Sequence, residues 1–340
     1  MSPTGAVTST PSIAVVIPNW NGRRWLPECL RSLAQQTRPA DEVIVVDNGS
    51  SDGSLAYLRD EHPNVRVLAH GTNTGFAYAA NRGIEAAGGE LVALINTDVV
   101  LSSDWLERMA GALQARPDAA SAACKMLSLE QPGVVYDAGD VLRRDGACDQ
   151  RGRFGADDGR FDAPGQVFGA CAGAAVYRRD AVLHAGGFDE RFFAYLEDVD
   201  LALRLRLRGW TCAYEPAVCW HAGEGSSDQL SGGHWPLVAR NTIVLVVKAF
   251  PVRWLGFVAY RQLGWLWHAR LERRLCAHVR GLLSAIPLMP HALRERRALR
   301  ESATVPIEVV VPKISIRGAK RPARTPASTE RAASHNKIER

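Results

Sequence analysis

The sequence predicts an α/β fold with a mostly parallel sheet covered by helices on both faces, followed by a C-terminal helical extension. Short apolar runs predict four buried strands, at residues 13–17, 43–46, 65–68 and 91–95. Helical patterns separate these runs near residues 52–60, 74–87 and 103–115. Apolar strands that alternate with helices are typical of a parallel sheet, and its ligands bind beyond the carboxyl ends of the strands. The loops of interest therefore begin at Pro18, Asp47, Ala69 and Asn96.

The rest of the chain is less regular. Residues 125–165 are rich in Gly, Asp and Arg, and they predict an irregular excursion with a hairpin near residues 134–136 and 140–143. A second ordered block is expected from Phe168 to Trp220. Residues 236–300 have a helical pattern with many Arg and Trp.

The segment from Leu201 to Leu207 gives conflicting signals. Its leucines occupy every second position, which is the period of a strand. Leu and Arg are good helix formers, however, acidic residues lead the segment, and Gly209 stands where a helix would stop. We therefore expect a helix here.

Charge is divided unevenly along the chain. The net charge is +5, but residues from Lys248 onward carry +13 and the first 247 residues carry −8. An acidic body with a basic end indicates two functions in one chain, and it makes a nucleic-acid partner a poor expectation. The seven cysteines include no C-x-x-C pair, so we expect reduced thiols in the cytoplasm rather than a zinc site or disulfides.

No targeting or membrane-spanning segment is expected. Residues 1–11 have no basic residue ahead of an apolar stretch, which argues against an ordinary secretory signal. The longest apolar region, residues 243–259, is interrupted by Lys248, Pro251 and Arg253. A spanning helix needs roughly 18 or more apolar residues.

Carboxylates follow two of the predicted strands. Asp47 comes directly after the strand at 43–46, where it could bind a nucleobase or a ribose hydroxyl. A turn is the simpler explanation, because Asn-Gly follows it. In Asn96-Thr97-Asp98 the carboxylate could hold a divalent cation that neutralises a diphosphate, and an N-cap or loop carboxylate is the alternative.

Two further candidates lie in the second block. Glu197-Asp198-Val199-Asp200 places three carboxylates just after the aromatic residues 192–195. Burial and like-charge repulsion raise a carboxylate pKa toward the range of a general base, but acids also simply favour the first turn of a helix. His221 ends a predicted strand and is either a metal ligand or, more commonly, a surface or core histidine.

Taken in order, these motifs resemble the family 2 inverting glycosyltransferases of GT-A fold. The resemblance runs through VIPNWNG (16–22), VDNGSSDG (46–53), NTGFA (73–77), NRG (81–83), NTD (96–98), FFAYLEDVDLALRLRLRG (192–209) and His221 with GSS (225–227). It covers residues 12–245. It is most similar to the bacterial rhamnosyltransferase branch, which uses dTDP-rhamnose to build cell-surface polysaccharide.

The resemblance implies a nucleotide-sugar donor and assigns it a binding site. Pro18, Asn19, Asn21 and Asp47 would hold the base and the ribose. Asn81 lies in the motif that would flank the donor.

The resemblance also implies a cofactor, Mg²⁺ or Mn²⁺. Asp98 would be the carboxylate of the metal-binding triplet and His221 the second protein ligand. The triplet in the family often carries an acid at both ends, whereas here its first position is Asn96. Only one carboxylate of the triplet then faces the cation, so His221 becomes more important as a metal ligand.

The same resemblance assigns the chemistry. Asp198 would be the catalytic base, with Glu197 beside it orienting an acceptor hydroxyl. One base and one displacement would invert the anomeric configuration. Asp200 and Arg204 stand one helical turn apart and predict a structural ion pair.

Aromatic residues alternate with arginines in the C-terminal block. The aromatics are Phe250, Trp254, Phe257, Tyr260, Trp265 and Trp267, and the arginines are Arg253, Arg261, Arg270, Arg273 and Arg274. This composition suits an anionic membrane surface, where a lipid-linked acceptor would be found, and predicts a cytoplasmic protein peripheral to the inner face of the membrane. A helical cap or a homo-oligomer interface is the alternative.

These observations predict four parts. They are a disordered N-terminus (1–11), a GT-A catalytic domain (12–245), a helical basic-aromatic extension (246–303) and a poorly ordered basic tail (304–340).

Two other functions fit the sequence less well. A sugar-nucleotide pyrophosphorylase would need a Gly-rich phosphate loop with a basic residue after the first strand, where this chain has PNWNG (18–22). A non-catalytic membrane-associated scaffold that binds sugar nucleotides would have no need of Asp98, Asp198 and His221 together.

Overall fold

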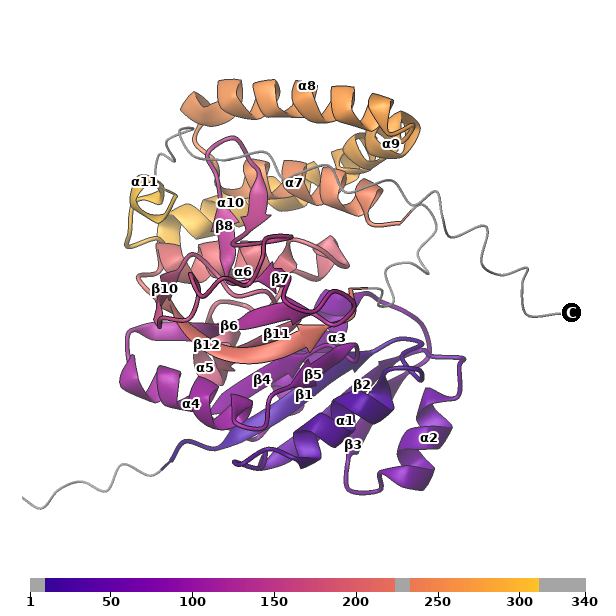
Figure 1. Ribbon diagram of the computed structural model, residues 1–340. Coiled ribbons are helices and arrows are strands. Elements are labelled where there is room, and N and C mark those ends of the chain that lie inside the picture. Colours follow the sequence, from indigo (N-terminus) through magenta and orange to yellow (C-terminus); the bar gives the residue numbers. More distant parts are fainter. Residues whose placement is uncertain (1–9, 224–232, 312–340) are drawn as a thin grey trace, which may run out of the picture.

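The computed structural model describes residues 10–223 and 233–311 and contains one large mixed sheet between helical layers (Figure 1). The strands are β1 (Ile13–Asn19), β2 (Glu42–Asn48), β3 (Arg66–His70), β4 (Leu91–Ile95), β5 (Val99–Leu101), β6 (Ala119–Ser128), β7 (Val135–Asp137), β8 (Asp140–Leu142), β9 (Cys148–Gln150), β10 (Gly165–Val167), β11 (Ala174–Arg178) and β12 (Thr211–His221).

The sheet order is β10-β12-β6-β11-β4-β1-β2-β3, with β5 on β12 and β7 on β6. Strands β3, β2, β1 and β4 are parallel, and so are β6 and β12. The antiparallel strand β11 lies between β4 and β6 and joins the two halves. All four predicted strands of the first half are present, and the α/β fold class is confirmed.

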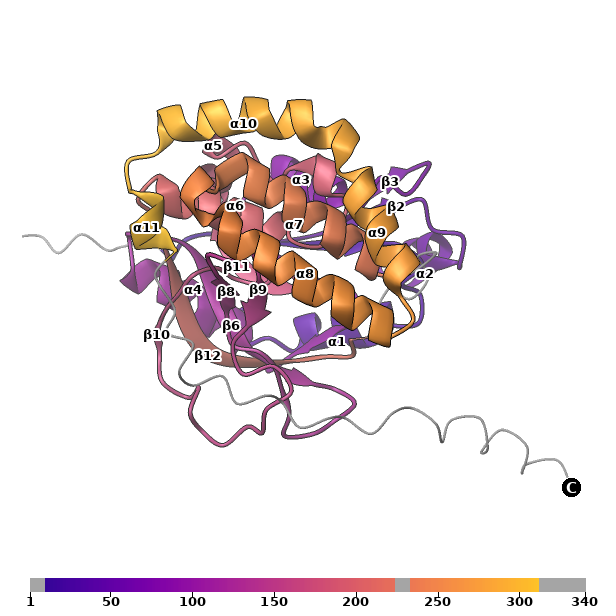
Figure 2. The same ribbon diagram turned by 90° about the horizontal axis from the view of Figure 1, so that it is seen from above.

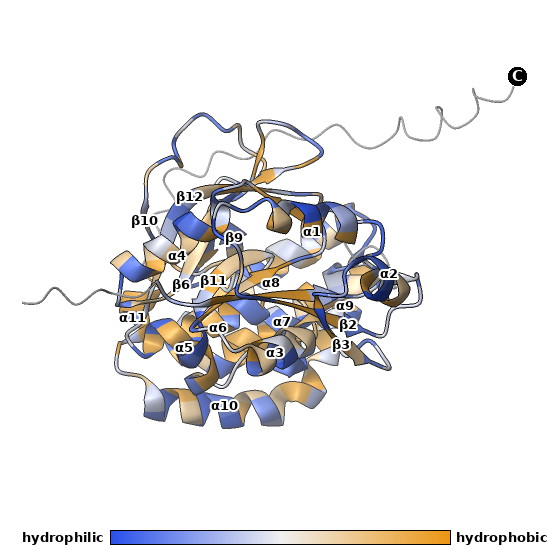
Figure 3. Cartoon of the chain, turned by 90° about the horizontal axis from the view of Figure 1, so that it is seen from below, coloured by the Kyte–Doolittle hydropathy of each residue, from blue (hydrophilic) through white to orange (hydrophobic). Residues whose placement is uncertain are grey.

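The helices are α1 (Leu26–Ala34), α2 (Ser54–Glu61), α3 (Phe76–Ala86), α4 (Trp105–Ala115), α5 (Arg179–His184), α6 (Glu197–Leu207), α7 (Trp235–Ala249), α8 (Leu255–Leu271), α9 (Leu275–Ser284), α10 (Met289–Ser302) and α11 (Ile307–Val310), with 3₁₀ turns η1 (Glu190–Phe192), η3 (Val252–Trp254) and η4 (Ile286–Leu288). Side chains alternate between the faces of a strand. Ile13, Val15 and Ile17 of β1 therefore pack with α1 and α4, whereas Ala14 and Val16 pack with α3 and α6. The strands are the apolar centre of the molecule (Figure 3).

Helix α6 is buried on two sides, which explains the misleading period of its leucines. Leu201 and Leu205 belong to the core against the sheet. Val199, Leu203 and Leu207 belong to a second core, formed with the C-terminal helices. A helix that carries apolar residues on opposite faces shows them at every second position, so the predicted helix is confirmed.

The C-terminal helices form an additional layer over α6 (Figures 1 and 2). Helix α7 begins at Trp235 and runs to Ala249, so it crosses the predicted domain boundary at residue 245 without a break. Val244, Leu245 and Val246 are buried in the core that α7 shares with α6. Within residues 10–223 and 233–311, no helix has both the length and the apolar character needed to cross a membrane.

Packing continues beyond the predicted start of the tail at Thr304. The backbone N–H groups of Thr304 and Val305 both donate to the Leu207 carbonyl, at 2.8 and 3.0 Å. Arg144 Nε donates to the Val311 carbonyl at 2.8 Å, and Val311 is fully buried. The part of the chain that is folded onto α6 therefore extends at least to Val311.

The predicted hairpin at 134–143 is wrong in its pairing. Both strands exist, but β7 pairs with β6, whereas β8 pairs with β9. The reason is Gly139, whose φ of 105° turns the chain between β7 and β8. The β8–β9 hairpin then leaves the sheet and reaches toward α8 (Figure 1). All seven cysteines are free thiols in the structure.

Candidate active site

Asp47 lies buried at the end of β2 and organises the loops after β1 and β2. Its Oδ2 accepts a hydrogen bond from Asn19 Nδ2 at 2.6 Å, and its Oδ1 accepts one from the Ser50 N–H at 3.0 Å. Ser50 Oγ accepts from the Asn21 N–H at 2.8 Å, and Asn21 Oδ1 accepts from the Ser51 N–H at 2.9 Å. The structure thus brings together three of the four residues predicted to hold the donor base and ribose, namely Asn19, Asn21 and Asp47. Asn19 Oδ1 is buried without a hydrogen-bond partner.

Pro18 borders this group, whereas Asn81 is hydrogen-bonded to another part of the chain. Pro18 stands opposite Val46 in the sheet and leads into the loop. Asn81, on α3, accepts from the Phe188 N–H and donates to the Phe188 carbonyl and to Glu190 Oε1, at 2.8 to 2.9 Å. The chain itself therefore occupies the Asn81 amide, which leaves it no N–H for the predicted contact with a donor.

Strand β5 assembles the predicted metal pair. It pairs with the end of β12 so that Val99 lies opposite His221, and the Ala222 N–H donates to the Asp98 carbonyl at 3.0 Å. His221 Nε2 lies 3.5 Å from Asp98 Oδ1, and both residues are buried. Burial lowers the pKa of His221, although the Asp98 carboxylate opposes this effect. The imidazole is therefore neutral at physiological pH, which is the form that binds metals.

These two side chains fit a divalent cation that is shared with a ligand. His221 Nδ1 is buried without a hydrogen-bond partner. Among the residues that the structure describes, no group of three or more His, Cys, Asp or Glu could hold a metal alone. Mg²⁺ is commonly bound by one or two carboxylates together with waters and substrate phosphates. Phosphates would therefore have to complete the coordination.

Two residues of the 125–165 excursion, which the sequence did not single out, lie beside the metal pair. The Tyr136 ring lies against the His221 ring, with centroids 4.5 Å apart. The Arg153 guanidinium lies 4.4 Å from the centroid of the Tyr136 ring. Arg153 forms no ion pair with any residue in the described part of the chain. A positive charge is thus held next to Asp98 and His221.

Glu197 and Asp198 begin α6. The Ala172 N–H donates to Asp198 Oδ2 at 3.2 Å, and the Val199 N–H donates to Oδ1 at 2.8 Å. The protein packed around Asp198 raises its pKa, although these hydrogen bonds oppose the effect. Burial, then the charge of Asp198, raises the pKa of Glu197 well above its ordinary value.

Asp198 is connected to the Asn96-Thr97-Asp98 triplet through the chain before β11. Ala172 contacts Asp198, and the carbonyl of the next residue, Gly173, accepts from the Asn96 N–H at 2.8 Å. The predicted base and the predicted metal triplet therefore lie on either side of one short segment.

Two buried carboxylates that the sequence did not single out, Asp137 and Asp140, interact electrostatically with Asp198. Burial raises the pKa of Asp137 to about 7. Burial, then the charge of Asp198, raises the pKa of Asp140 well above its ordinary value. In the sequence these residues are only two acids in a Gly-containing run. They could not be assigned to the site, because their approach to Asp198 depends on the turn at Gly139.

The loop between η1 and α6 has an unusual backbone. Phe193, Tyr195 and Leu196 have φ values of 65°, 71° and 66°. Such conformations cost about 1–3 kcal/mol for each non-glycine residue and persist only where the surroundings hold them. The Phe193 carbonyl accepts from the Ala77 N–H at 3.1 Å, and Gly75 approaches so closely that a Cβ there would lie 2.6 Å from the Phe193 oxygen.

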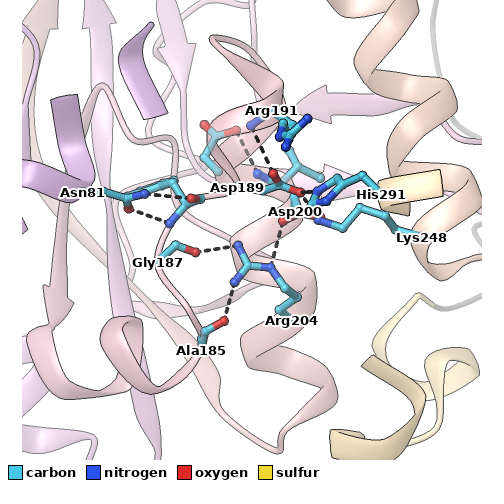
Figure 4. Close-up of polar contacts among 12 residues, drawn as sticks. Asn81, Ala185, Gly187, Asp189, Arg191, Asp200, Arg204, Lys248 and His291 are labelled. Atoms are coloured by element: carbon cyan, nitrogen blue, oxygen red, sulfur yellow. Dashed lines mark hydrogen bonds and ion pairs between the residues drawn. The ribbon is translucent and has the colours of Figure 1, made fainter. Parts of the chain in front are cut away.

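Buried ion pairs anchor α6 and η1 to the C-terminal helices (Figure 4). Arg204 Nε lies 2.8 Å from Asp200 Oδ2, which confirms the predicted pair. Lys248 Nζ of α7 lies 2.7 Å from Asp200 Oδ1 and 2.6 Å from Asp189 Oδ2. His291 of α10 also reaches Asp189, at 2.8 Å. The helix that carries the predicted base in its first turn is thus held by an ion pair to α7.

Comparison with known proteins gives the class of this chain. The family described as "Glycosyl transferase family 2" matches residues 14–185. The chain belongs to this family of glycosyltransferases, and its sheet and covering helices form the GT-A fold that the resemblance implied. The motif GSS (225–227), part of that resemblance, lies outside the described residues.

One relative extends over nearly the whole chain. It is the N-acetylglucosaminyl-diphospho-decaprenol L-rhamnosyltransferase of Mycobacterium tuberculosis, 30% identical over 323 residues, which are 88% of this chain and 98% of the relative. Two solved structures share the fold. S. aureus TarS 1–349 gives a TM-score of 0.52 at 17% identity, over 86% of each chain. GalNAc-T7 with UDP, GalNAc and Mn²⁺ gives 0.57 at 14% identity, over 71% of this chain and 48% of that one.

Proposed function

We propose that the chain is a metal-dependent inverting glycosyltransferase that acts on a lipid-linked acceptor in cell-surface polysaccharide synthesis. The proposed reaction moves rhamnose from dTDP-rhamnose to an acceptor hydroxyl. The observation that carries the proposal is the approach of two sites, the Asp98–His221 pair and the half-buried carboxylate of Asp198, on either side of residues 172–173. The activity for which the mycobacterial relative is named supports the choice of sugar and of a diphospho-lipid acceptor.

The donor would lie across the ends of β1, β2 and β4. Asp47 and Asn19 hold the loops that receive the base and ribose, and the unpaired Asn19 Oδ1 can accept a hydrogen bond from the donor. Asp98 and His221 would hold Mg²⁺ or Mn²⁺, which neutralises charge on a departing diphosphate. The presence of UDP and Mn²⁺ in the GalNAc-T7 structure supports a cation in this fold. Arg153 adds a positive charge on the same side.

Asp198 would take the proton from the attacking acceptor hydroxyl. Its raised pKa makes it a stronger base than an ordinary aspartate, and the N–H groups of Ala172 and Val199 fix the direction of its carboxylate. Glu197, with a pKa raised well above its ordinary value, favours its protonated form and can donate a hydrogen bond that orients the acceptor. A single displacement with a single base inverts the anomeric carbon.

The acceptor would be met at the cytoplasmic face of the membrane through α8. Five large apolar residues form a stripe at helical spacing along this helix and are 59–80% exposed: Phe257, Tyr260, Leu263, Trp267 and Leu271. Helix α8 lies on the outside of the C-terminal layer (Figures 1 and 2). Apolar and aromatic residues next to arginines are typical of helices that lie in an anionic membrane surface.

A transfer assay tests the proposal. The purified chain is incubated with dTDP-rhamnose, Mg²⁺ or Mn²⁺, and N-acetylglucosaminyl-diphospho-polyprenol, and the lipid product is analysed by mass spectrometry. We expect addition of one deoxyhexose, loss of the reaction with chelator, and an inverted anomeric centre by NMR. Other nucleotide sugars serve as comparison donors. The absence of transfer from every donor, together with no metal-dependent binding of a nucleoside diphosphate, would rule the proposal out.

A further inference from the structure

Asn241 of α7 gathers the backbone carbonyls of the strained loop. The Asn241 side chain is fully buried. Its Nδ2 donates to the carbonyls of Phe192, Ala194 and Tyr195, at 3.0, 2.9 and 2.7 Å. The neighbouring Arg240 Nη2 donates to the same Phe192 carbonyl at 2.6 Å. The two N–H groups of one amide thus serve three carbonyls, those of Phe192, Ala194 and Tyr195.

These hydrogen bonds stabilise a backbone conformation that is unfavourable for the loop by itself. None of its three positive-φ residues is glycine, so each conformation is unfavourable unless the surroundings hold it. Buried carbonyls without donors would add a further cost. Asn241 removes that cost only while the loop keeps its left-handed course.

The held loop lies between the donor side and the base. On one side, the Phe193 carbonyl accepts from Ala77, and Gly75, which packs on Phe193, accepts from Asn48 Nδ2 at 3.0 Å. Asn48 follows the donor-side Asp47. On the other side, Leu196 is the N-cap residue of α6, directly before Glu197 and Asp198. A change in the loop therefore moves the base relative to the donor.

We propose that Asn241 is a positioning residue for sugar transfer, which fixes the loop of residues 193–196 and through it the place of Asp198. The inference rests on the proposed function, because it concerns the same base. It gives α7, which leads into the C-terminal extension, a part in the reaction that is separate from its packing.

The test replaces the two N–H donors without changing the size of the side chain. In Asn241→Asp we expect kcat for rhamnose transfer to fall about 10- to 100-fold, since displacements on the order of 1 Å cost up to about that much. The affinity for dTDP with Mg²⁺, measured by calorimetry, should change less than about twofold, because Asp198 acts on the acceptor and not on the donor. Hydrogen exchange of the amides of residues 194–200 should become faster.

Thr242→Ala is the matched control. Thr242 is the next residue of α7 and is buried, but its hydroxyl donates only within the helix, to the Val238 carbonyl at 2.8 Å. This variant should lose some stability and keep kcat and the exchange rates of the loop. If Asn241→Asp does not fold, Arg240→Gln removes one donor to the Phe192 carbonyl and should lower kcat by a smaller factor, again without loss of dTDP binding.

Two outcomes would overturn the inference. One is a folded Asn241→Asp protein with unchanged kcat and unchanged exchange in the loop. The other is a fall in kcat that Thr242→Ala reproduces in proportion to its loss of stability. A wild-type protein that neither binds dTDP nor transfers sugar would instead contradict the proposed function, and the hydrogen-exchange comparison would still test the hold of Asn241 on the loop.

Discussion

Among single residues, Asp198 is expected to carry the chemical step. We predict that Asp198→Asn lowers kcat by about two to four orders of magnitude, because loss of a general base typically has that effect. Binding of dTDP with Mg²⁺ should stay near the wild-type level. Rapid-quench assays measure the fall in kcat, and calorimetry measures the binding of dTDP. A variant that keeps more than a tenth of the turnover would move the base elsewhere, first to Glu197.

The raised pKa of Asp198 also sets the direction of the pH dependence. The base works only when ionised, so kcat should fall as the pH decreases through its raised pKa. The acidic limb should therefore lie at a higher pH than an ordinary aspartate would give. The limb should be absent from the residual activity of Asp198→Asn.

The metal pair gives a prediction on donor affinity. Asp98→Ala and His221→Ala should each weaken dTDP binding in Mg²⁺ or Mn²⁺ by about tenfold or more, because each removes one of two protein ligands. With chelator present, the variants and the wild type should bind dTDP equally weakly. Calorimetric titrations with and without metal measure both effects. Equal affinity of the wild type in metal and in chelator would contradict the site.

The raised pKa of Asp137 predicts that the free energy of unfolding decreases as the pH rises. Its pKa is about 7 in the folded protein, against 3.8 for an ordinary aspartate, because burial disfavours the charge. Between these values the unfolded chain loses the proton first, so stability should decrease as the pH rises from about 4 to about 7. Asp137→Asn should raise the Tm at pH 8, by about 2 °C or more for each kcal/mol of relief, and change little at pH 4. Calorimetry with chelator present measures this, and a lower Tm at pH 8 would contradict it.

Some residues of the candidate site could be singled out from the sequence, and others could not. Asp47, Asp98, Asp198 and His221 could be singled out because each lies near the end of a strand or in the first turn of a helix, where the order of motifs is informative. Asp137 and Arg153 could not, because they lie in an excursion without periodicity, and only the turn at Gly139 brings this segment to the site. Asn241 carried no signal at all, since its role depends on three carbonyls almost fifty residues earlier.

Among the elements, strands were easier to predict than pairings and boundaries. Buried parallel strands are continuous apolar runs, so β1, β2 and β4 could be read directly. Strand β7 pairs with the preceding β6 rather than with β8, because the chain turns at Gly139, and the apolar pattern does not show this turn. The boundary at 245 failed to separate two domains, because α7 uses apolar residues on both sides of it to cover α6.

Helices α6 and α7 are joined by a buried lysine, which gives a stability prediction. Burial by itself would raise the pKa of Asp189, but the charge of Lys248 outweighs burial and holds that pKa at about 2. Lys248→Met should cost about 3–5 kcal/mol, because it leaves Asp189 and Asp200 buried with less compensation. Urea unfolding measures this. Arg297→Met, at an exposed pair with Glu301, is the control and should cost less than about 1 kcal/mol.

At the scale of the whole molecule, the acidic body and the basic end are parts of one packed unit. The C-terminal helices cover α6 on the side away from the sheet and present α8 outward (Figure 2). The arginines that give this end its charge are partly used inside the protein, as with Arg261, which pairs with Asp145 of the β8–β9 turn at 2.5 Å. Net charge alone therefore overstates the charge that is available to bind a membrane. The apolar stripe on α8 is the more specific indication of a membrane-binding surface.

That stripe gives the last prediction. The wild-type protein should float with liposomes that contain anionic phospholipid at low salt, and Leu263→Glu with Trp267→Glu should abolish flotation. Both side chains are more than 60% exposed, so the double variant should keep its Tm and its affinity for dTDP. Leu293→Glu, at an exposed leucine of α10 away from α8, is the matched control and should float like the wild type. Flotation should weaken with added salt, because the arginines contribute through screened charge. If the wild type ignores anionic liposomes but the double variant changes from an oligomer to a monomer, the stripe is an interface between copies of the chain, and docking to the membrane through α8 is excluded.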